Sequence, residues 1–289
     1  MSRFVYVNGC YQHYANAFIH AEDRGFQFGD AVYEVCEIRH GMIIDESRHM
    51  ARLARSLTEL SIPEPMSVGA WHRVMRETIR RNKVTDGALY LQVSRGAGPR
   101  DFLFSGVKTQ PTVVCVARAV SPASQIKAAK QGIAVITQPD IRWGRCDIKT
   151  VMLLPASLAK EKARESGAQE AWFTDHEGNV TEGGSSNAWI ITHARQLITR
   201  PTDRSILRGV TRTTLTDIIA REGLTLVERA FSVAEAKAAN EAFITSATNL
   251  VMPVVRIDET TIGDGKPGPT TRRLREIFHD VAEAQPVAS

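Results

Sequence analysis

One short segment of the sequence gathers side chains that could take part in covalent chemistry. Within eight residues the chain places Arg142, Arg145, Asp147 and Lys149, and an apolar run follows directly. A lysine amine is almost always protonated near neutral pH, so a nucleophilic lysine needs neighbouring cations or burial. If the segment is extended, Arg145, Asp147 and Lys149 share one face, where the cation favours the uncharged amine and the carboxylate opposes it. On spacing alone, the pattern is more typical of a structural ion cluster than of a reactive amine.

A single acidic residue further along the chain lies in a segment that suits close approach to a ligand. Glu182 stands between a predicted turn and the Gly and Ser residues at 183–186. Glycine lets the backbone approach a ligand because no side chain intervenes. A lone glutamate beside a turn is usually solvated, so Glu182 indicates a binding site only together with other residues.

Two later segments have the composition of phosphate-binding loops. In the stretch LRGVTR, a predicted helix begins at Val210 and Thr211, directly after Leu207 and Gly209. The free N–H groups of a helix N-terminus attract phosphate. The second segment follows a predicted strand and consists of the small residues Ser246, Ala247 and Thr248.

Together these residues suit one cofactor. Pyridoxal phosphate needs a lysine that forms an imine, an acid for its pyridine nitrogen and anion-binding backbone for its phosphate. Lys149, Glu182 and the two loops supply these types of group, with a further arginine available. The set therefore indicates a pyridoxal phosphate site.

Strands and helices must position this set. Hairpin turns are predicted at Asn8-Gly9 and His40-Gly41. Helical spacing predicts a helix that ends before Pro63, others at about 68–81, 153–165 and 210–222, and a last one with Leu274, Ile277, Phe278 and Val281 on one face. Further strands are predicted near residues 88–94, 111–118, 132–137, 170–175, 186–192, 224–230 and 241–247. The tail at 282–289 is predicted to fray.

Length and composition predict the domain organisation. The chain has 289 residues, about twice the usual length of one domain. The stretch AVSPASQ has the Ser and Pro composition of a linker. We expect a small N-terminal α/β domain of residues 1–118, a linker at 119–125 and a larger cofactor-binding domain of residues 126–289.

Charge and hydropathy exclude several classes of protein. Lys and Arg number 36 and Asp and Glu number 32, without a basic block, which argues against a nucleic-acid partner. The longest apolar stretch is interrupted by Arg118 and is too short to span a membrane, and the N-terminus does not resemble a signal peptide. The cysteines are scattered, which fits a reducing compartment. We therefore expect a cytoplasmic protein.

Two short pattern matches carry no function. The stretch GDGKPG at 263–268 fits the dinucleotide-binding glycine pattern, but two prolines and the lack of a strand, helix and strand unit indicate a turn. The stretch SLAK at 157–160 fits a serine nucleophile pattern, but it lies inside an amphipathic helix and lacks partner motifs.

Four segments resemble the branched-chain and D-amino-acid aminotransferase family, which is fold type IV of the pyridoxal phosphate enzymes. They are EDRGFQFGDAVYEV, DIRWGRCDIK, VTEGGSSN and LRGVTR, and the resemblance runs from about Arg3 to Phe278. It implies two α/β (α+β) domains, the larger with a barrel-like sheet, with the cofactor between them. It also implies a homodimer.

The resemblance implies a role for each matching residue. Lys149 is the Schiff-base lysine, Glu182 pairs with the pyridine nitrogen, and Tyr33 is an active-site tyrosine. Arg100, beside Phe102, binds the carboxylate of a substrate that lies in the active site of the partner subunit. The phosphate is expected to be bound by Arg52, Leu207, Gly209, Val210, Thr211, Ser246, Ala247 and Thr248.

Two positions depart from the family pattern. D-amino-acid transaminases usually show an arginine, any residue and a histidine in the carboxylate loop, where this chain has Arg100, Asp101 and Phe102. Phenylalanine cannot donate a hydrogen bond, so one of the two side chains that usually bind the substrate carboxylate is missing. Ala247 stands where the family commonly has a threonine, and backbone N–H groups, Ser246 or Thr248 could compensate.

Within the family, YEV, RGAGPR and RWGRCDIK are most similar to D-amino-acid transaminase. This similarity predicts ping-pong transfer of an amino group from a D-amino acid of the D-alanine type to a 2-keto acid. Phe102 predicts a drier pocket that also accepts (R)-amines. A branched-chain L-amino-acid transaminase and an aminodeoxychorismate lyase are the alternatives, and the intact Lys149 and Glu182 argue against a non-enzymatic scaffold.

Overall fold

The computed structural model describes residues 4–104 and 109–286, which form two compact units. The first unit contains the chain up to Pro122, the short segment Ile148–Met152 and the segment from Glu283. The second unit contains Ala123–Asp147 and Leu153–Ala282. Lys149 therefore belongs to the first unit, although the chain on both sides of its segment belongs to the second.

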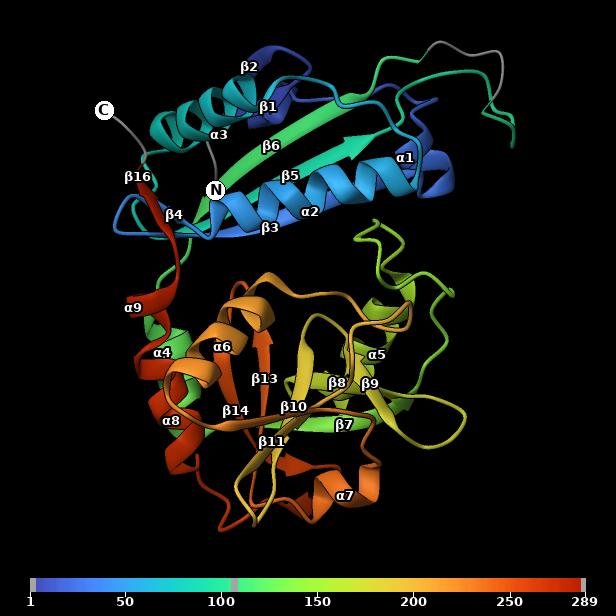
Figure 1. Cartoon of the computed structure of the whole chain (residues 1–289). Helices are drawn as coiled ribbons and strands as arrows, with labels where there is room; N and C mark the ends of the chain where they lie inside the picture. Colours follow the sequence, from blue (N-terminus) through green and yellow to red (C-terminus); the bar gives the residue numbers. More distant parts are fainter. Residues whose placement is uncertain (1–3, 105–108, 287–289) are drawn as a thin grey trace. The chain divides into compact units, whose positions relative to one another are not determined.

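The first unit is built on a seven-stranded sheet with the order β16-β4-β3-β5-β6-β1-β2 (Figure 1). All pairings in this sheet are antiparallel. Its strands are β1 (Phe4–Val7), β2 (Cys10–His13), β3 (Ala31–Arg39), β4 (Met42–Ile44), β5 (Gly87–Ser94), β6 (Thr112–Ala119) and β16 (Ala284–Pro286).

Tight turns form the two hairpins of this sheet. Asn8 and Gly9 join β1 to β2, and His40 and Gly41 join β3 to β4, all with positive φ. A two-residue turn with positive φ at both positions matches the twist of the flanking strands. Both predicted hairpins are therefore confirmed.

Two long helices cover one face of the sheet in the first unit (Figure 1). α2 (Glu46–Glu59) packs against β3, and α3 (Val68–Asn82) packs against β6 and β1. Ser67 caps α3 by accepting a hydrogen bond from the Ala70 N–H group. The remaining helices described in this unit are the short η1 (Tyr14–Asn16) and α1 (Arg24–Phe28).

The C-terminal segment corrects one expectation. The tail was predicted to fray, but Ala284–Pro286 forms β16, which pairs with β4, and the Asp45 N–H group donates to Glu283 O at 2.7 Å. An edge strand offers unpaired backbone groups, and β16 satisfies those of β4. Residues 287–289 lie outside the described part of the chain.

The second unit is built on a nine-stranded mixed sheet with the order β12-β11-β10-β13-β14-β7-β8-β9, in which β15 pairs with β14. The edge strand β9 also contacts β10, so the sheet curls into a half-barrel. Its strands are β7 (Ile133–Pro139), β8 (Glu170–Thr174), β9 (Val180–Gly183), β10 (Asn187–Ile191), β11 (Gln196–Thr199), β12 (Thr225–Glu228), β13 (Glu241–Ser246), β14 (Leu250–Ile257) and β15 (Thr260–Thr261).

Helices flank this sheet (Figure 1). They are α4 (Ala123–Gln131), α5 (Leu154–Glu165), α6 (Val210–Arg221), α7 (Val233–Lys237), α8 (Pro269–Glu276) and α9 (Phe278–Val281). The predicted last helix is two helices that meet at Ile277, but the predicted apolar face is confirmed because Leu274 and Phe278 are buried in one cluster. In the described part of the chain, no helix is both long and apolar enough to cross a lipid bilayer.

Candidate active site

The segment that carries Lys149 is a turn followed by a short bridge. Residues 145–149 are not extended, so their side chains do not alternate between two faces as in a strand. Arg145, Asp147 and Lys149 therefore lack the strand geometry that would place them on one face. The Tyr33 N–H group donates to Lys149 O at 3.0 Å, and the Val151 N–H group donates to Ala31 O at 3.1 Å. These bonds fix the lysine backbone to β3 within the first unit.

The side chain of Lys149 lies against Tyr33. Its Nζ atom is 4.3 Å from the centroid of the Tyr33 ring, which is within the range of a cation–π contact. The ring of Tyr90 on β5 lies 5.7 Å from that of Tyr33, centroid to centroid. The structure therefore brings together two residues that were predicted from distant motifs, Lys149 and Tyr33.

Glu182 is a buried carboxylate on β9, not a solvated loop residue. Its Oε1 atom accepts from Arg142 Nη1 at 2.5 Å, and its Oε2 atom accepts from Asn187 Nδ2 and from the Leu207 N–H group, each at 3.0 Å. Because both oxygens accept hydrogen bonds, the group is held in one orientation. Donors from three separate segments of the second unit thus converge on this side chain.

Arg142 links this carboxylate to a second one. It donates to Asp140 Oδ1 and Oδ2 at 2.9 and 2.7 Å and to Ser205 O at 3.1 Å. Burial alone would lower the pKa of Arg142, but the bond to Asp140 and the charge of Glu182 raise it above its usual value. Burial would likewise raise the pKa of Asp140, and the bonds and charge of Arg142 lower it instead.

The other charged and thiol groups of this segment have structural roles. Arg145 and Asp147 form a bidentate ion pair with distances of 2.9 and 3.0 Å. Burial raises the pKa of the Cys146 thiol to about 11, so the thiol stays protonated near neutral pH.

Asn187 joins Glu182 to the start of α6 and to the end of β13. Its Nδ2 atom also donates to Leu207 O at 2.9 Å, and its backbone pairs with Thr245 in the sheet. A Cβ atom at Gly209 would lie 2.2 Å from Asn187 Oδ1, so a residue with a side chain does not fit there without movement. The two predicted phosphate loops therefore meet beside Glu182.

The start of α6 has the properties of an anion site. Gly209 precedes the helix and provides no side-chain cap, and the N–H groups of Val210 and Thr211 have no acceptor within the helix. The Ser246 hydroxyl accepts from the Asn249 N–H group at 3.2 Å, which leaves its proton available to a ligand. Ala247 and Thr248 follow in the turn between β13 and β14. A carboxylate beside an open helix N-terminus fits a cofactor that has a ring nitrogen and a phosphate.

Arg52 lies in the first unit and is paired with Glu34. Its Nε and Nη2 atoms donate to the two Glu34 oxygens at 2.8 and 2.7 Å, and His49 Nδ1 lies 2.7 Å from Glu34 Oε2. Burial alone would raise the pKa of Glu34, but Arg52 and His49 together lower it to about 2. Arg52 is thus held rigidly against β3.

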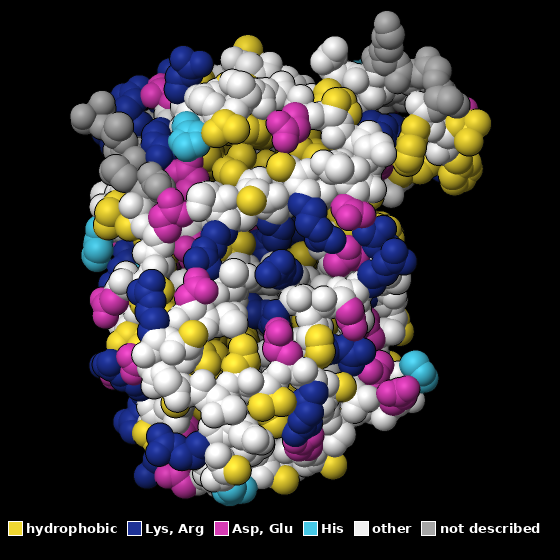
Figure 2. All heavy atoms as spheres, in the orientation of Figure 1, with side chains coloured by type: hydrophobic (Ala, Val, Ile, Leu, Met, Phe, Trp, Pro, Cys, Tyr) yellow, Lys and Arg dark blue, Asp and Glu magenta, His cyan; other side chains and the backbone are white. Residues whose placement is uncertain are grey.

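Arg100 and Phe102 lie on the loop that follows β5, and both are exposed. Hydrophobic side chains gather where this loop projects from the first unit (Figure 2).

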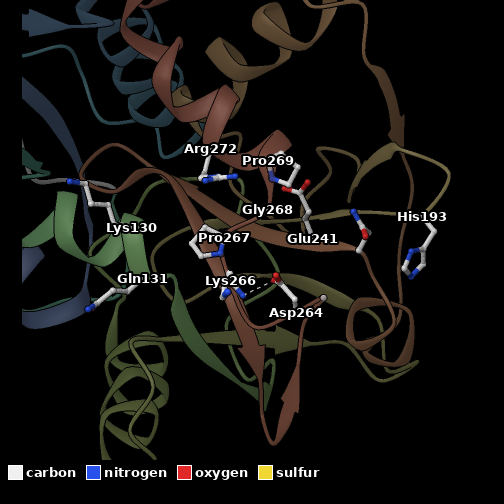
Figure 3. Close-up of a pocket in the computed structure, with 12 residues that line it drawn as sticks. Lys130, Gln131, His193, Glu241, Asp264, Lys266, Pro267, Gly268, Pro269 and Arg272 are labelled. Carbon is white, nitrogen blue, oxygen red and sulfur yellow. Dashed lines mark hydrogen bonds between the residues drawn. The ribbon is translucent and has the colours of Figure 1, made fainter.

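The dinucleotide-like stretch is a turn, as expected, and lines a depression of about 800 Å³ (Figure 3). The Glu241 carboxylate occupies the N-terminus of α8, where it accepts from the Thr270 and Thr271 N–H groups at 3.1 and 2.8 Å. A Cβ atom at Gly268 would lie 2.1 Å from Glu241 Cδ, so this glycine serves packing. The SLAK stretch at 157–160 lies on α5, as expected.

Three residues of these networks were missed from the sequence. The roles of Arg142 and Asn187 depend on contacts with residues that are distant in the sequence, which no local sequence pattern predicts. Glu34 did leave a signal, because it occupies a core-facing position in the alternation of Val32, Cys36 and Ile38. A charged residue at such a position indicates a buried ion pair.

Comparisons with known proteins identify the family. The family model described as Amino-transferase class IV matches residues 31–257. A D-alanine aminotransferase of Bacillus licheniformis is 38% identical over 278 residues, which cover 96% of each chain. A D-alanine aminotransferase of Staphylococcus haemolyticus is 36% identical over 283 residues, which cover 97% of this chain and 98% of that protein.

Solved structures show the same fold at lower identity. The branched-chain amino acid aminotransferase of Escherichia coli has a TM-score of 0.87 at 21% identity, with 100% of both chains covered. That of Thermoproteus uzoniensis has a TM-score of 0.84 at 22% identity, also with 100% of both chains covered. From the family match, the relatives and the fold together, the chain belongs to the amino-transferase class IV family.

Proposed function

We propose that this protein is a pyridoxal phosphate-dependent aminotransferase that moves the amino group of a D-amino acid of the D-alanine type to a 2-keto acid. One observation carries the proposal: the Glu182 carboxylate, fixed by three donor residues, lies beside the uncapped start of α6. The match to D-alanine aminotransferases along nearly the whole chain supports the choice of donor.

When bound, the cofactor supplies a ring that takes up the electrons released as the substrate loses its α-proton. Glu182 would face the pyridine nitrogen and retain a proton on it. The N–H groups of Val210 and Thr211 would bind the phosphate. Leu207, Gly209, Ser246, Ala247 and Thr248 would surround it, with backbone N–H groups or hydroxyls replacing the hydroxyl that Ala247 lacks. Arg52 would add a positive charge while Glu34 holds its guanidinium.

Lys149 would hold the cofactor covalently and then act as the base. Once an incoming amino group had taken its place, the free Lys149 amine would accept the proton from the substrate α-carbon. The Tyr33 ring, 4.3 Å from Nζ, limits where this amine can go. The keto acid product leaves before the second substrate binds, which makes the reaction ping-pong.

Substrate selection would depend on Arg100 and Phe102. The planar guanidinium of an arginine suits bidentate binding of a carboxylate. Phe102 adds an apolar wall but no donor, so we expect weaker selection for small D-amino acids and acceptance of (R)-arylalkylamines. A branched-chain L-amino acid transaminase shares this fold, as the solved structures indicate, but the relatives with higher identity favour D-alanine.

We also propose a cytoplasmic homodimer in which Arg100 acts in the active site of the partner subunit. The cysteines in the described chain are free, which fits a reducing compartment. The exposed hydrophobic loop around Phe102 is typical of a surface that another chain covers.

A half-reaction tests the proposal. Purified protein is mixed separately with D-alanine, L-leucine and (R)-1-phenylethylamine without keto acid, and the visible absorbance of the bound cofactor is followed. We expect fast loss with D-alanine and slower loss with the amine. Loss mainly with L-leucine would identify the branched-chain alternative, and no loss with any donor would favour the lyase.

Replacing the lysine provides the matched control. Lys149→Ala is expected to abolish both turnover and the absorbance of the lysine-bound cofactor, because the covalent bond and the base are lost together. Lys162→Ala, which removes an exposed lysine on α5, is expected to leave both unchanged. Turnover near the wild-type rate in Lys149→Ala would show that the assignment is wrong.

A further inference from the structure

The guanidinium of Arg100 lies against two aromatic rings. Its Cζ atom is 5.2 Å from the centroid of the Phe28 ring and 6.0 Å from that of the Phe102 ring. The two rings lie 5.7 Å apart, centroid to centroid, with an interplanar angle of 66°. Among the described residues, no carboxylate pairs with Arg100, so its charge is available to a ligand.

The loop that carries this arginine is anchored to a buried ion cluster. Asp30 accepts from Arg24 Nε at 2.8 Å and from Arg95 Nε at 2.7 Å, and all three side chains are largely buried. Arg24 Nη1 in turn donates to Asp101 O at 2.5 Å, next to Arg100 in the chain. The backbone at Asp101 is therefore fixed to the core of the first unit.

The same cluster also contacts Phe104, further along the loop. The Arg95 Cζ atom lies 3.8 Å from the centroid of the Phe104 ring, and the Arg24 Cζ atom lies 5.3 Å from it. The Arg24 Cζ atom also lies 4.5 Å from the Phe28 ring centroid. Phe28 thus contacts both the anchoring arginine and Arg100, and it ties the exposed loop to α1.

We propose that Phe28 and Phe102 form an aromatic clamp that orients Arg100 and thereby sets the carboxylate specificity of this chain. The inference rests on the proposed function, in which Arg100 binds the substrate carboxylate. A cation–π contact uses the charge of a guanidinium and does not require its N–H groups as hydrogen-bond donors, so these donors remain able to bind a carboxylate bidentately. Phe102 therefore contributes orientation instead of a second hydrogen bond.

The clamp is a positioning device, so its loss should change carboxylate binding more than the chemical step. Phe102→Leu keeps an apolar side chain but removes the ring, and Phe102→Tyr keeps the ring. An exposed cation–π contact changes an equilibrium by about two- to fivefold. We expect Phe102→Leu to raise KM for D-alanine by that factor with little change in kcat, and Phe102→Tyr to stay near wild type.

Inhibition by propionate isolates the carboxylate contact, because propionate has no amino group to react. Its inhibition constant against D-alanine should rise in Phe102→Leu by the same factor as KM. Phe26→Leu is the matched control, since Phe26 is also exposed on α1 and contacts no cation among the described residues. A variant that only loses folded protein would lower kcat and leave the inhibition constant unchanged.

The outcomes separate the clamp from the proposed function. Turnover of D-alanine by the wild type, with an unchanged KM and inhibition constant in Phe102→Leu, would overturn the clamp alone. Failure of propionate to inhibit the wild type would also overturn it, because an oriented receptor must bind the carboxylate by itself. No turnover of D-alanine by the wild type would overturn the proposed function.

Discussion

At the residue scale, Arg142 is the side chain that compensates the charges of the Asp140 and Glu182 carboxylates. It bonds to both Asp140 and Glu182, and removing one partner of a buried ion pair costs about 3–5 kcal/mol because the remaining charge is uncompensated. We expect Arg142→Gln to lower the free energy of unfolding by about this amount and to weaken cofactor binding. Denaturant unfolding of the cofactor-free protein and a cofactor titration measure the two effects.

The control for this substitution is an arginine in an exposed ion pair. Arg164 pairs with Glu161 on the surface of α5, so Arg164→Gln should leave both measurements unchanged. Equal losses in the two variants would show that Arg142 has no special role. The sequence indicated Lys149 and Glu182 through motifs, but it could not indicate Arg142, because its contacts join residues 40 positions apart.

At the element scale, the docking of α2 on β3 depends on a buried charge cluster that should respond to acid. Glu34 on β3 is held by Arg52 and His49 on α2, and its pKa is lowered from 4.5 to about 2. A carboxylate whose pKa is lower in the folded protein than in the unfolded chain stabilises the fold at pH values above the unfolded-state pKa. This stabilisation is lost as the pH falls toward the folded-state pKa. We expect about 3 kcal/mol of stability that is present above about pH 5 and lost toward pH 2.

Unfolding of Glu34→Gln and wild type across this pH range measures that contribution. The difference between the two proteins should be largest above pH 5 and should shrink as the pH falls, because the wild-type carboxylate becomes protonated. A constant difference would contradict the assignment. The fold itself was predictable where signals are local, as at the Asn8-Gly9 hairpin, whereas β16 was not, because its partner β4 is distant in the sequence.

At the scale of the whole molecule, the proposed homodimer requires residues of two chains to act together. Arg100→Ala removes the carboxylate receptor, and Lys149→Ala removes the covalent lysine, so each variant alone should be inactive toward D-alanine. If Arg100 acts in the partner's active site, a mixed dimer holds one site with Lys149 from the Arg100→Ala chain and Arg100 from the Lys149→Ala chain. That site is intact.

Mixing the two variants under conditions that exchange subunits therefore tests the assembly. In an equal mixture half of the dimers of a two-fold symmetric protein are mixed, and each has one intact site of two, so about a quarter of the wild-type activity should return. If Arg100 instead served its own chain, the mixed dimer would contain one site without Arg100 and one site without Lys149. Activity would then stay absent, and the loop around Phe102 would belong to the active site of its own subunit.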